Sequence, residues 1–307
     1  MRDGCFGSED APNQAAQLGV RVQGSIAQIV ALTTYGNAFL RGLTEFNESF
    51  YPANSTFKFC ERIEFVGMQP DGEKWKEALL AADPIAWLEV IRSDGVTGLQ
   101  MSYGPSGAKE SSDRMMVGFV GGGGRWRIEA IGSRSSDWWS GRWQIGDRDR
   151  KDQRIWRVTY GRFAEGQPQR GQHTEDLARL RGELERCLGE IAEFAHAQQF
   201  GEFAKAFESG LARLRSELPY NDLYHTDIAP LQLLPLSARQ LLGASQAAWV
   251  FGGMGSWNDV VVGRESQGRY DELSERLYAL LNRAIVAAAN SSMAPMPPKK
   301  RSWKFWN

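Results

Sequence analysis

The stretch WWSGRWQIGDRDRKDQRIWRVTYGRF, from Trp138 to Phe163, decides the fold class because its apolar and basic residues alternate. It holds four tryptophans and seven arginines or lysines. Successive side chains of a β-strand point to opposite faces of a sheet, so a period of two separates a buried face from a wet one. The pattern predicts two strands joined by the charged loop 146–153. The apolar side chains expected on the buried face are Trp143 and Ile145 on the first strand, and Trp156, Val158 and Tyr160 on the second.

The basic residues of this stretch fall mainly on the solvent side of the predicted strands. Arg142 and Arg157 are out of phase with the tryptophans, and Arg154 lies near a strand end, where a long side chain reaches water. Acids alternate with bases in the loop and dilute any field that would attract phosphate. We therefore expect a core sheet. The alternative is a nucleic-acid surface, which would require exposed aromatic rings beside Arg142, Arg154 and Arg157.

The residues before this stretch predict further strands and a few helices. Ser25 to about Phe46 is expected to be a helix, and Phe57–Phe65 alternates as a half-buried strand. Residues 72–95 predict two short helices, because Asp83-Pro84 interrupts them. Another strand is expected at residues 99–103, and two more form a hairpin over residues 113–132, which turns at Gly121–Gly124. Runs of strands with tight turns indicate an α+β fold with an antiparallel β meander and flanking helices.

The second half of the chain changes to a helical period after the polar linker 164–174. Apolar stripes at a spacing of 3.6 residues predict four helices, the first of them behind Thr174 as its N-cap. The expected organisation is a flexible lead (1–18), an α+β domain with an antiparallel sheet (19–165), a helical domain or a helical layer packed on the sheet (166–290), and a disordered basic-aromatic tail (291–307).

Composition limits the classes of function. The 307 residues carry a net charge of -1, so no global field favours polyanions. Three cysteines, Cys5, Cys60 and Cys187, lie far apart, which argues against a disulfide framework or a cysteine-based zinc site. The polar start does not resemble a signal peptide, and no apolar run is long enough to span a membrane. We expect a cytoplasmic protein without a metal or cofactor.

Two segments contain residue types that suit catalysis. In PYNDLYHTD (219–227), His225 stands near Asp227, an arrangement that suits a general base or a metal ligand. No second ligand cluster accompanies it, and the alternative is a loop whose polar side chains cap turns. Glu61 is in phase with the apolar side chains of its strand, so it is expected to be a partly buried carboxylate at a site. The alternatives are a structural pair with an inward-reaching arginine, or a bulge that turns Glu61 outward.

Glycine-rich and aromatic segments supply the remaining candidates. Gly252, Gly253 and Gly255 lack the lysine of a P-loop and the spacing of a dinucleotide fold, so they more simply end a helix. Gly121–Gly124 is expected to be a turn, with close approach of a ligand as the alternative. In the terminal segment 299–307, basic residues accompany Trp303 and Trp306. That combination suits weak contact with a membrane surface or an acidic partner, and the alternative is a solvated terminus.

These observations lead to three hypotheses about function. The first is a non-enzymatic binding protein of the bacterial cytosol that docks a protein partner, in an immunity or accessory role; its binding residues would be Arg142, Arg154, Arg157, Trp303 and Trp306. The second is an enzyme with a cleft between the sheet and the helical half. It predicts that Glu61, His225 and Asp227 converge in one pocket. The third is the nucleic-acid surface described above.

Overall fold

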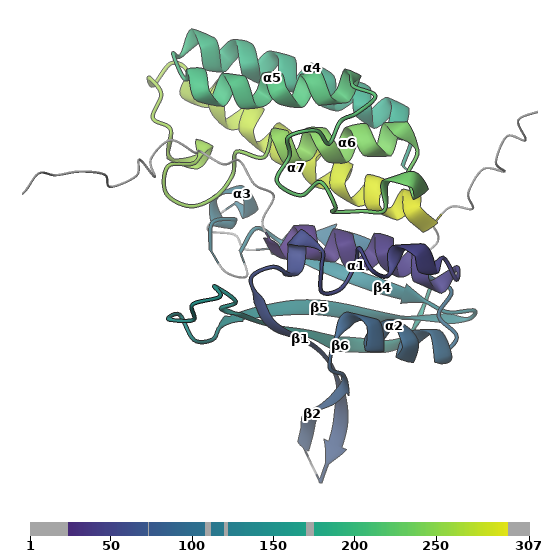
Figure 1. Cartoon of the computed structure of the whole chain (residues 1–307). Coiled ribbons are helices and arrows are strands. Elements are labelled where there is room, and N and C mark those ends of the chain that lie inside the picture. Colours follow the sequence, from purple (N-terminus) through teal and green to yellow (C-terminus); the bar gives the residue numbers. More distant parts are fainter. Residues whose placement is uncertain (1–23, 73, 108–111, 120–121, 170–174, 294–307) are drawn as a thin grey trace, which may run out of the picture.

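The computed structural model describes residues 24–72, 74–107, 112–119, 122–169 and 175–293, which form three layers. A six-stranded sheet forms the first layer, α1 lies against its inner face, and four long helices form the third layer above α1 (Figure 1). Helix α1 (Gly24–Leu40) contacts β3 (Gly98–Gly104) on one side and α7 (Gln267–Asn290) on the other. Thus α1 joins the sheet to the helical layer.

The remaining elements have these bounds. The other helices are α2 (Pro84–Ser93), α3 (Asp113–Met116), α4 (Leu177–Ala197), α5 (Gly201–Arg215) and α6 (Leu236–Ala247). The other strands are β1 (Cys60–Asp71), β2 (Lys74–Ala81), β4 (Arg125–Ile131), β5 (Ser135–Ile145) and β6 (Trp156–Pro168). Five short 3-10 helices are η2 (Thr44–Phe46), η3 (Ser55–Phe57), η4 (Leu231–Leu233), η5 (Trp257–Asp259) and η6 (Ser291–Met293).

The sheet is mixed, so the α+β class is confirmed but the purely antiparallel sheet is wrong. The strand order is β2-β1-β6-β5-β4-β3, and β1 pairs with β6 in parallel. The chain leaves β2 at one edge, crosses through α2 and begins β3 at the opposite edge. The antiparallel meander β3 to β6 then returns to β1. A period of two identifies each strand, but it does not say which strands become neighbours or in which direction they run.

Three local predictions also need correction. Residues 74–81 form strand β2 and not a helix, because pairing with β1 (Val66 opposite Leu79, Met68 opposite Glu77) overrides a sequence rich in helix formers. Residues 113–116 form helix α3, capped by Ser112, so the hairpin expected there is the pair β3–β4 with α3 between its strands. Helix α1 ends at Leu40, earlier than expected.

The other predicted elements are confirmed apart from some of their ends. The strand expected at Phe57–Phe65 begins at Cys60, because Ser55–Phe57 forms η3, and β6 continues to Pro168, into the expected linker 164–174. Helix α4 is capped by Asp176 and not by Thr174. The β5–β6 hairpin, β3 and the four C-terminal helices occur where the patterns place them. The imperfect stripe of α1 also has an explanation, because the helix is buried on all sides from Ile26 to Phe39 and its polar residues tie the layers together. Gln28 accepts a hydrogen bond from the Tyr160 hydroxyl at 2.9 Å and donates to the carbonyl of Thr56 at 3.3 Å.

The two edges of the sheet end differently. At edge strand β3, the amide of Asn37 accepts from Leu99 N at 2.8 Å and donates to Leu99 O at 2.9 Å. Asn290 of α7 makes the same two bonds with Met101, at 2.8 and 2.9 Å. Two side chains therefore replace a neighbouring strand. At the other edge, β1 and β2 project from the body as a hairpin (Figure 1).

The described part of the chain contains no helix that is both long and apolar enough to cross a membrane.

Candidate functional site

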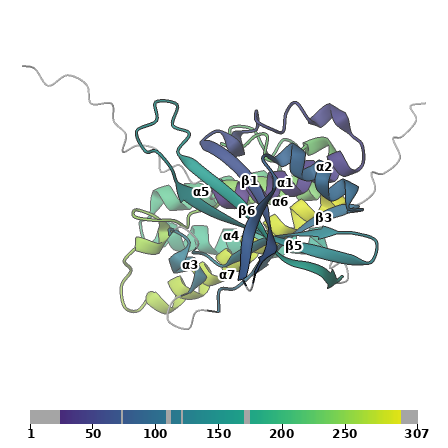
Figure 2. The same ribbon diagram turned by 90° about the horizontal axis from the view of Figure 1, so that it is seen from below.

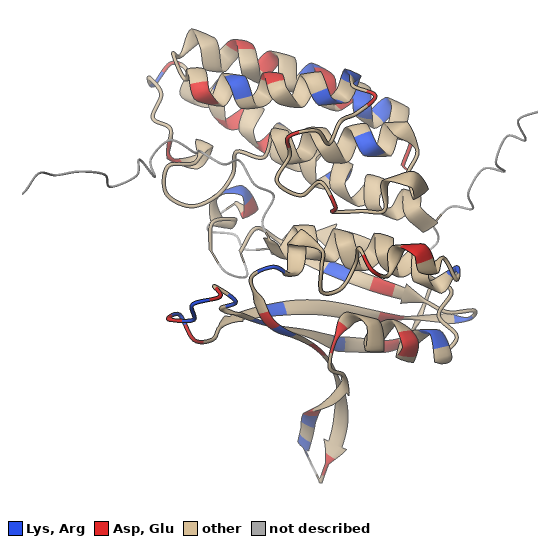
Figure 3. Ribbon diagram, viewed as in Figure 1, with Lys and Arg blue, Asp and Glu red and all other residues tan. Residues whose placement is uncertain are grey.

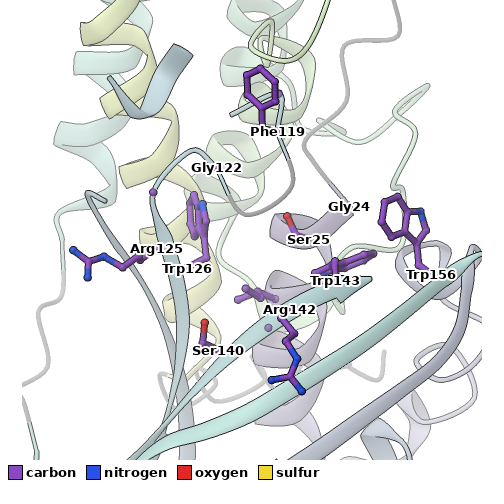
Figure 4. A pocket seen from close by; sticks show the side chains of 14 residues that line it. Gly24, Ser25, Phe119, Gly122, Arg125, Trp126, Ser140, Arg142, Trp143 and Trp156 are labelled. Atoms are coloured by element: carbon purple, nitrogen blue, oxygen red, sulfur yellow. The ribbon is translucent and has the colours of Figure 1, made fainter. Parts of the chain in front are cut away.

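A pocket of about 470 Å³ opens where β4 and β5 separate. The two strands pair only over four positions, ending at Ile128 opposite Trp139. Beyond that point β4 pairs with β3 alone, and residues 140–145 of β5 pair with β6 alone. The sheet is therefore split at this end. The pocket occupies the split, below the first turn of α1 (Figure 4).

Three tryptophan rings form much of the wall. Trp143 and Trp156 meet edge to face with ring centroids 5.7 Å apart, while Trp126 packs on Tyr103 at 4.9 Å. All three are half-buried, although their phase in the strands predicted the buried face of a sheet. Their inward direction is as expected. What the pattern did not reveal is that the sheet opens beside them and leaves part of each ring accessible.

A glycine-rich loop closes the opposite side of the pocket with Gly118, Phe119, Gly122 and Gly124. Its backbone is tightly seated: a Cβ atom at Gly118 would lie 2.6 Å from the carbonyl oxygen of Gly252. Gly124 has a φ of +92°, in the region that favours glycine. Gly118, just before the predicted turn Gly121–Gly124, thus packs against Gly252 and Gly253, while Gly122 and Gly124 of the turn itself line the pocket.

The pocket lining contains arginine stems but none of the acidic, lysine or histidine side chains among the described residues. Arg142 is engaged with Glu77 through two hydrogen bonds of 2.5 and 2.6 Å. Arg125 donates to the carbonyls of Pro105 and Ser106 at 3.1 and 2.9 Å. Figure 4 shows both guanidinium groups pointing away from the ring of Trp143. The interior is therefore aromatic and carries no side-chain charge of its own.

His225 and Asp227 do come together, but with Ser55 between them. The Ser55 hydroxyl lies 2.7 Å from His225 Nδ1 and donates a short hydrogen bond to Asp227 Oδ1. Asp227 Oδ2 accepts from Ser55 N at 2.7 Å, and the Asp227 carbonyl accepts from Tyr35 and Asn54. No sequence pattern links Ser55 to His225, although the run Asn54-Ser55-Thr56 is a recognisable capping signal.

This order of groups suits anchoring better than nucleophilic catalysis. A serine relay requires the imidazole between the hydroxyl and the carboxylate, so that one base receives the serine proton. Here the single hydroxyl proton of Ser55 is directed at Asp227, which leaves the hydroxyl to accept from the Nδ1–H tautomer of His225. His225 is also buried, with 5% of its surface exposed. The cluster fastens the loop before α6 to the segment around η3.

Glu61 lies elsewhere, in an ion pair with Arg157 at 2.8 Å and near Arg150 at 3.9 Å. The hydrogen bond from Arg157 lowers the pKa of the Glu61 carboxyl. None of the contacts within the described residues joins Glu61 to His225 or Asp227. Arg154 donates to the carbonyl of Cys60 at 2.7 Å. The three arginines proposed as binding residues, Arg142, Arg154 and Arg157, therefore all have intramolecular partners.

The outer face of the sheet, opposite α1, carries large apolar side chains in water. Cross-strand pairing places Met68 beside Glu77 and Pro70 beside Trp75, and the Arg142–Glu77 ion pair shows that these residues share the outer face. The exposed apolar members are Met68 (46%), Trp75 (64%), Leu79 (60%) and Phe163 (50%), which we call the outer apolar residues. Figure 2 looks onto this side of the strands, with the helical layer behind them.

Other candidates add little to the site. Trp303 and Trp306 lie outside the described residues, and no group of three or more histidine, cysteine or acidic side chains suited to a metal occurs within the described ranges. Figure 3 shows that acidic and basic residues are interspersed along the sheet and helices. Comparison with protein-family models, curated proteins and solved structures found no match.

Proposed function

We propose that this chain is a non-enzymatic interaction protein that docks a protein partner on the outer face of its sheet. The observation that carries the proposal is the set of outer apolar residues, Met68, Trp75, Leu79 and Phe163, on a face that the described helices leave uncovered. Large aromatic side chains at the centre of an interface commonly supply most of its binding energy. A cytoplasmic location belongs to the same proposal, since Cys60 and Cys187 are free thiols.

The shape of the hairpin indicates what kind of partner fits. Strands β1 and β2 extend beyond the body, and Trp75 and Leu79 stand on the same side of β2. A flat surface would meet only the tip of such a projection. The partner we propose therefore has an apolar groove that receives Trp75 and Leu79. Its rim is polar, to match the ion pairs Arg142–Glu77 and Arg62–Glu64 on this face.

The same geometry favours a protein partner over the two alternatives. Nucleic acid is bound chiefly by cations that are available to phosphate, whereas Arg142 and Arg157 already pair with glutamates. An enzyme built on Glu61, His225 and Asp227 would need these groups in one cleft, and the contacts divide them between two places. The nucleic-acid alternative is an outcome of the experiment below.

The experiment is site-specific photo-crosslinking in cells of the source organism. A photoreactive phenylalanine analogue replaces Trp75 in one strain and Met254 in the other. Met254 is fully exposed on a loop of the helical layer and serves as the matched control. We expect a protein adduct at position 75 that is absent at position 254 and lost on Leu79→Ala. Adducts that are equal at both positions, or only nucleic acid at position 75, would overturn the proposal.

A further inference from the structure

We propose that the pocket in the split between β4 and β5 binds a planar aromatic group that is neutral or anionic. This site is separate from the outer apolar residues and does not depend on the proposed function. Its volume, about 470 Å³, is in the range of pockets that enclose a small organic ligand. The shape and the charge of the lining together define the ligand class.

The rings favour a flat partner. Trp143 and Trp156 meet edge to face, and Trp126 stands on the other strand of the split, supported by Tyr103. The half-buried indole rings offer accessible aromatic surface between two walls (Figure 4). A planar ring packs on such surfaces by offset stacking or edge contacts, and a branched aliphatic group of the same volume makes fewer of these contacts.

The charges disfavour a cation, although tryptophan cages often bind cations. Such sites gain from a nearby carboxylate, and this lining has none among the described residues. Gly24 and Ser25 of α1 also form part of the wall, and neither carries a charge. Arg125, which donates to the backbone carbonyls of Pro105 and Ser106, keeps its positive charge at the edge of the lining, and this charge opposes a cation and tolerates an anion.

The pocket is also preformed. Gly118 lies close against the backbone of Gly252 and Gly253, so this residue of the pocket wall is packed on both sides. The Tyr278 hydroxyl donates to the carbonyl of Gly123 at 2.7 Å, which fixes the loop from α7. Phe119 is 64% exposed at the rim, where it adds aromatic surface without a role in the core. Little conformational entropy is lost when a ligand enters such a site.

The test compares three probes with one ring and different charge: 2-naphthol, 2-naphthoate and 2-naphthylmethylammonium. Binding to the full-length protein is measured by calorimetry, and the site is located from the indole N–H resonances in an NMR spectrum. We expect the naphthol or the naphthoate to bind and the ammonium compound to bind more weakly by about tenfold or more. Equal or tighter binding of the ammonium compound, or no binding of any probe at millimolar concentration, would refute the proposal.

Variants show whether the probes use this pocket. Trp143→Ala should abolish binding, and Phe119→Ala and the pocket-filling Ser140→Phe should weaken it, whereas Trp75→Ala on the outer face should leave it unchanged. Phe119 and Ser140 are exposed, so these two variants decide the matter if Trp143→Ala does not fold. Binding that survives all three pocket variants would place the probes elsewhere and overturn the assignment.

A free metabolite and an aromatic side chain of another polypeptide share this ligand chemistry. Indole-3-acetate and N-acetyltryptophanamide distinguish the two sources, because they present the same ring as a free acid and as a residue in a chain. Tighter binding of the acid indicates a metabolite, and tighter binding of the amide indicates a side chain. If neither ligand binds, the proposal about the pocket is contradicted. The result of the crosslinking experiment at Trp75 does not depend on this outcome, because it tests the outer face of the sheet.

Discussion

The side-chain amide of Asn37 provides a direct test of how the backbone groups of edge strand β3 are satisfied. Asn37 is 2% exposed, and its side chain satisfies both backbone groups of Leu99 on edge strand β3. Asn37→Leu keeps the number and branching of the side-chain heavy atoms and removes both bonds. Each buried backbone group left without a partner costs about 1–3 kcal/mol, so the free energy of unfolding should fall by about 2–6 kcal/mol. The bond from Asn37 to the Ser292 hydroxyl, 2.8 Å long, places the loss in the upper part of that range.

The assay is denaturant unfolding followed by tryptophan fluorescence and by circular dichroism, whose transitions should coincide if a free energy is to be quoted. The matched control is Thr33→Val, one turn earlier on α1. The Thr33 hydroxyl is buried and has no hydrogen-bond partner among the described residues, so its removal should cost nothing or stabilise. If Asn37→Leu lowers the free energy of unfolding by less than about 1 kcal/mol, or by no more than Thr33→Val does, the Asn37 amide does not take the place of a neighbouring strand.

Three further predictions concern the pocket loop, the buried thiol and the anchored loop. Gly122→Ala should distort the loop beside the pocket, because the added Cβ would overlap the carbonyl oxygen of Met116, and a lower melting temperature measured by calorimetry would show it. Burial raises the pKa of the Cys60 thiol to about 11 from an ordinary 9.0. The protonated thiol therefore contributes fully to the free energy of unfolding below pH 9.0, and this contribution is lost as the pH rises towards 11. Cys60→Ala should remove the corresponding part of the loss of stability at alkaline pH, measured by denaturant unfolding. Asp227→Asn should weaken the bonds to Ser55 and cost about 1–3 kcal/mol, with faster proteolysis of the loop before α6 but unchanged cleavage elsewhere.

The sequence predicts most elements of this fold and little of its assembly. The alternation around Trp143 and Trp156 correctly identifies two strands, because it follows from burial of one face. Strand β2 escapes prediction because its lysine, glutamate, alanine and leucine favour a helix, and only the pairing with β1 decides otherwise. The parallel pair β1–β6 joins residues that are almost a hundred positions apart, and a local period carries no information about such a neighbour.

Candidate residues show the same limit at the level of single side chains. His225 and Asp227 were chosen for their chemistry and do meet, yet the residue that gives the cluster its character, Ser55, is contributed by a segment 170 positions earlier. Glu61 was in phase with buried residues, and its position beside Arg157 corresponds to the structural pair that the sequence left open. The type of a residue indicates which chemical reactions its side chain is able to support. The arrangement of its neighbours in space decides which of these roles the side chain has in the folded protein.

Two irregularities in the sheet account for both proposed surfaces. The register of β5 against β6 shifts on either side of Trp138, just before β5 leaves β4, and a bulge increases the local twist of a strand. Residues 140–145 lie beyond this shift, where β5 no longer pairs with β4, and the tryptophan pocket opens there. The register of β1 against β2 shifts between Phe65 and Val66, just before the buried part of β1 ends at Gly67 and its projecting part begins. In both places a bulge lies next to a surface for which we propose a ligand or a partner.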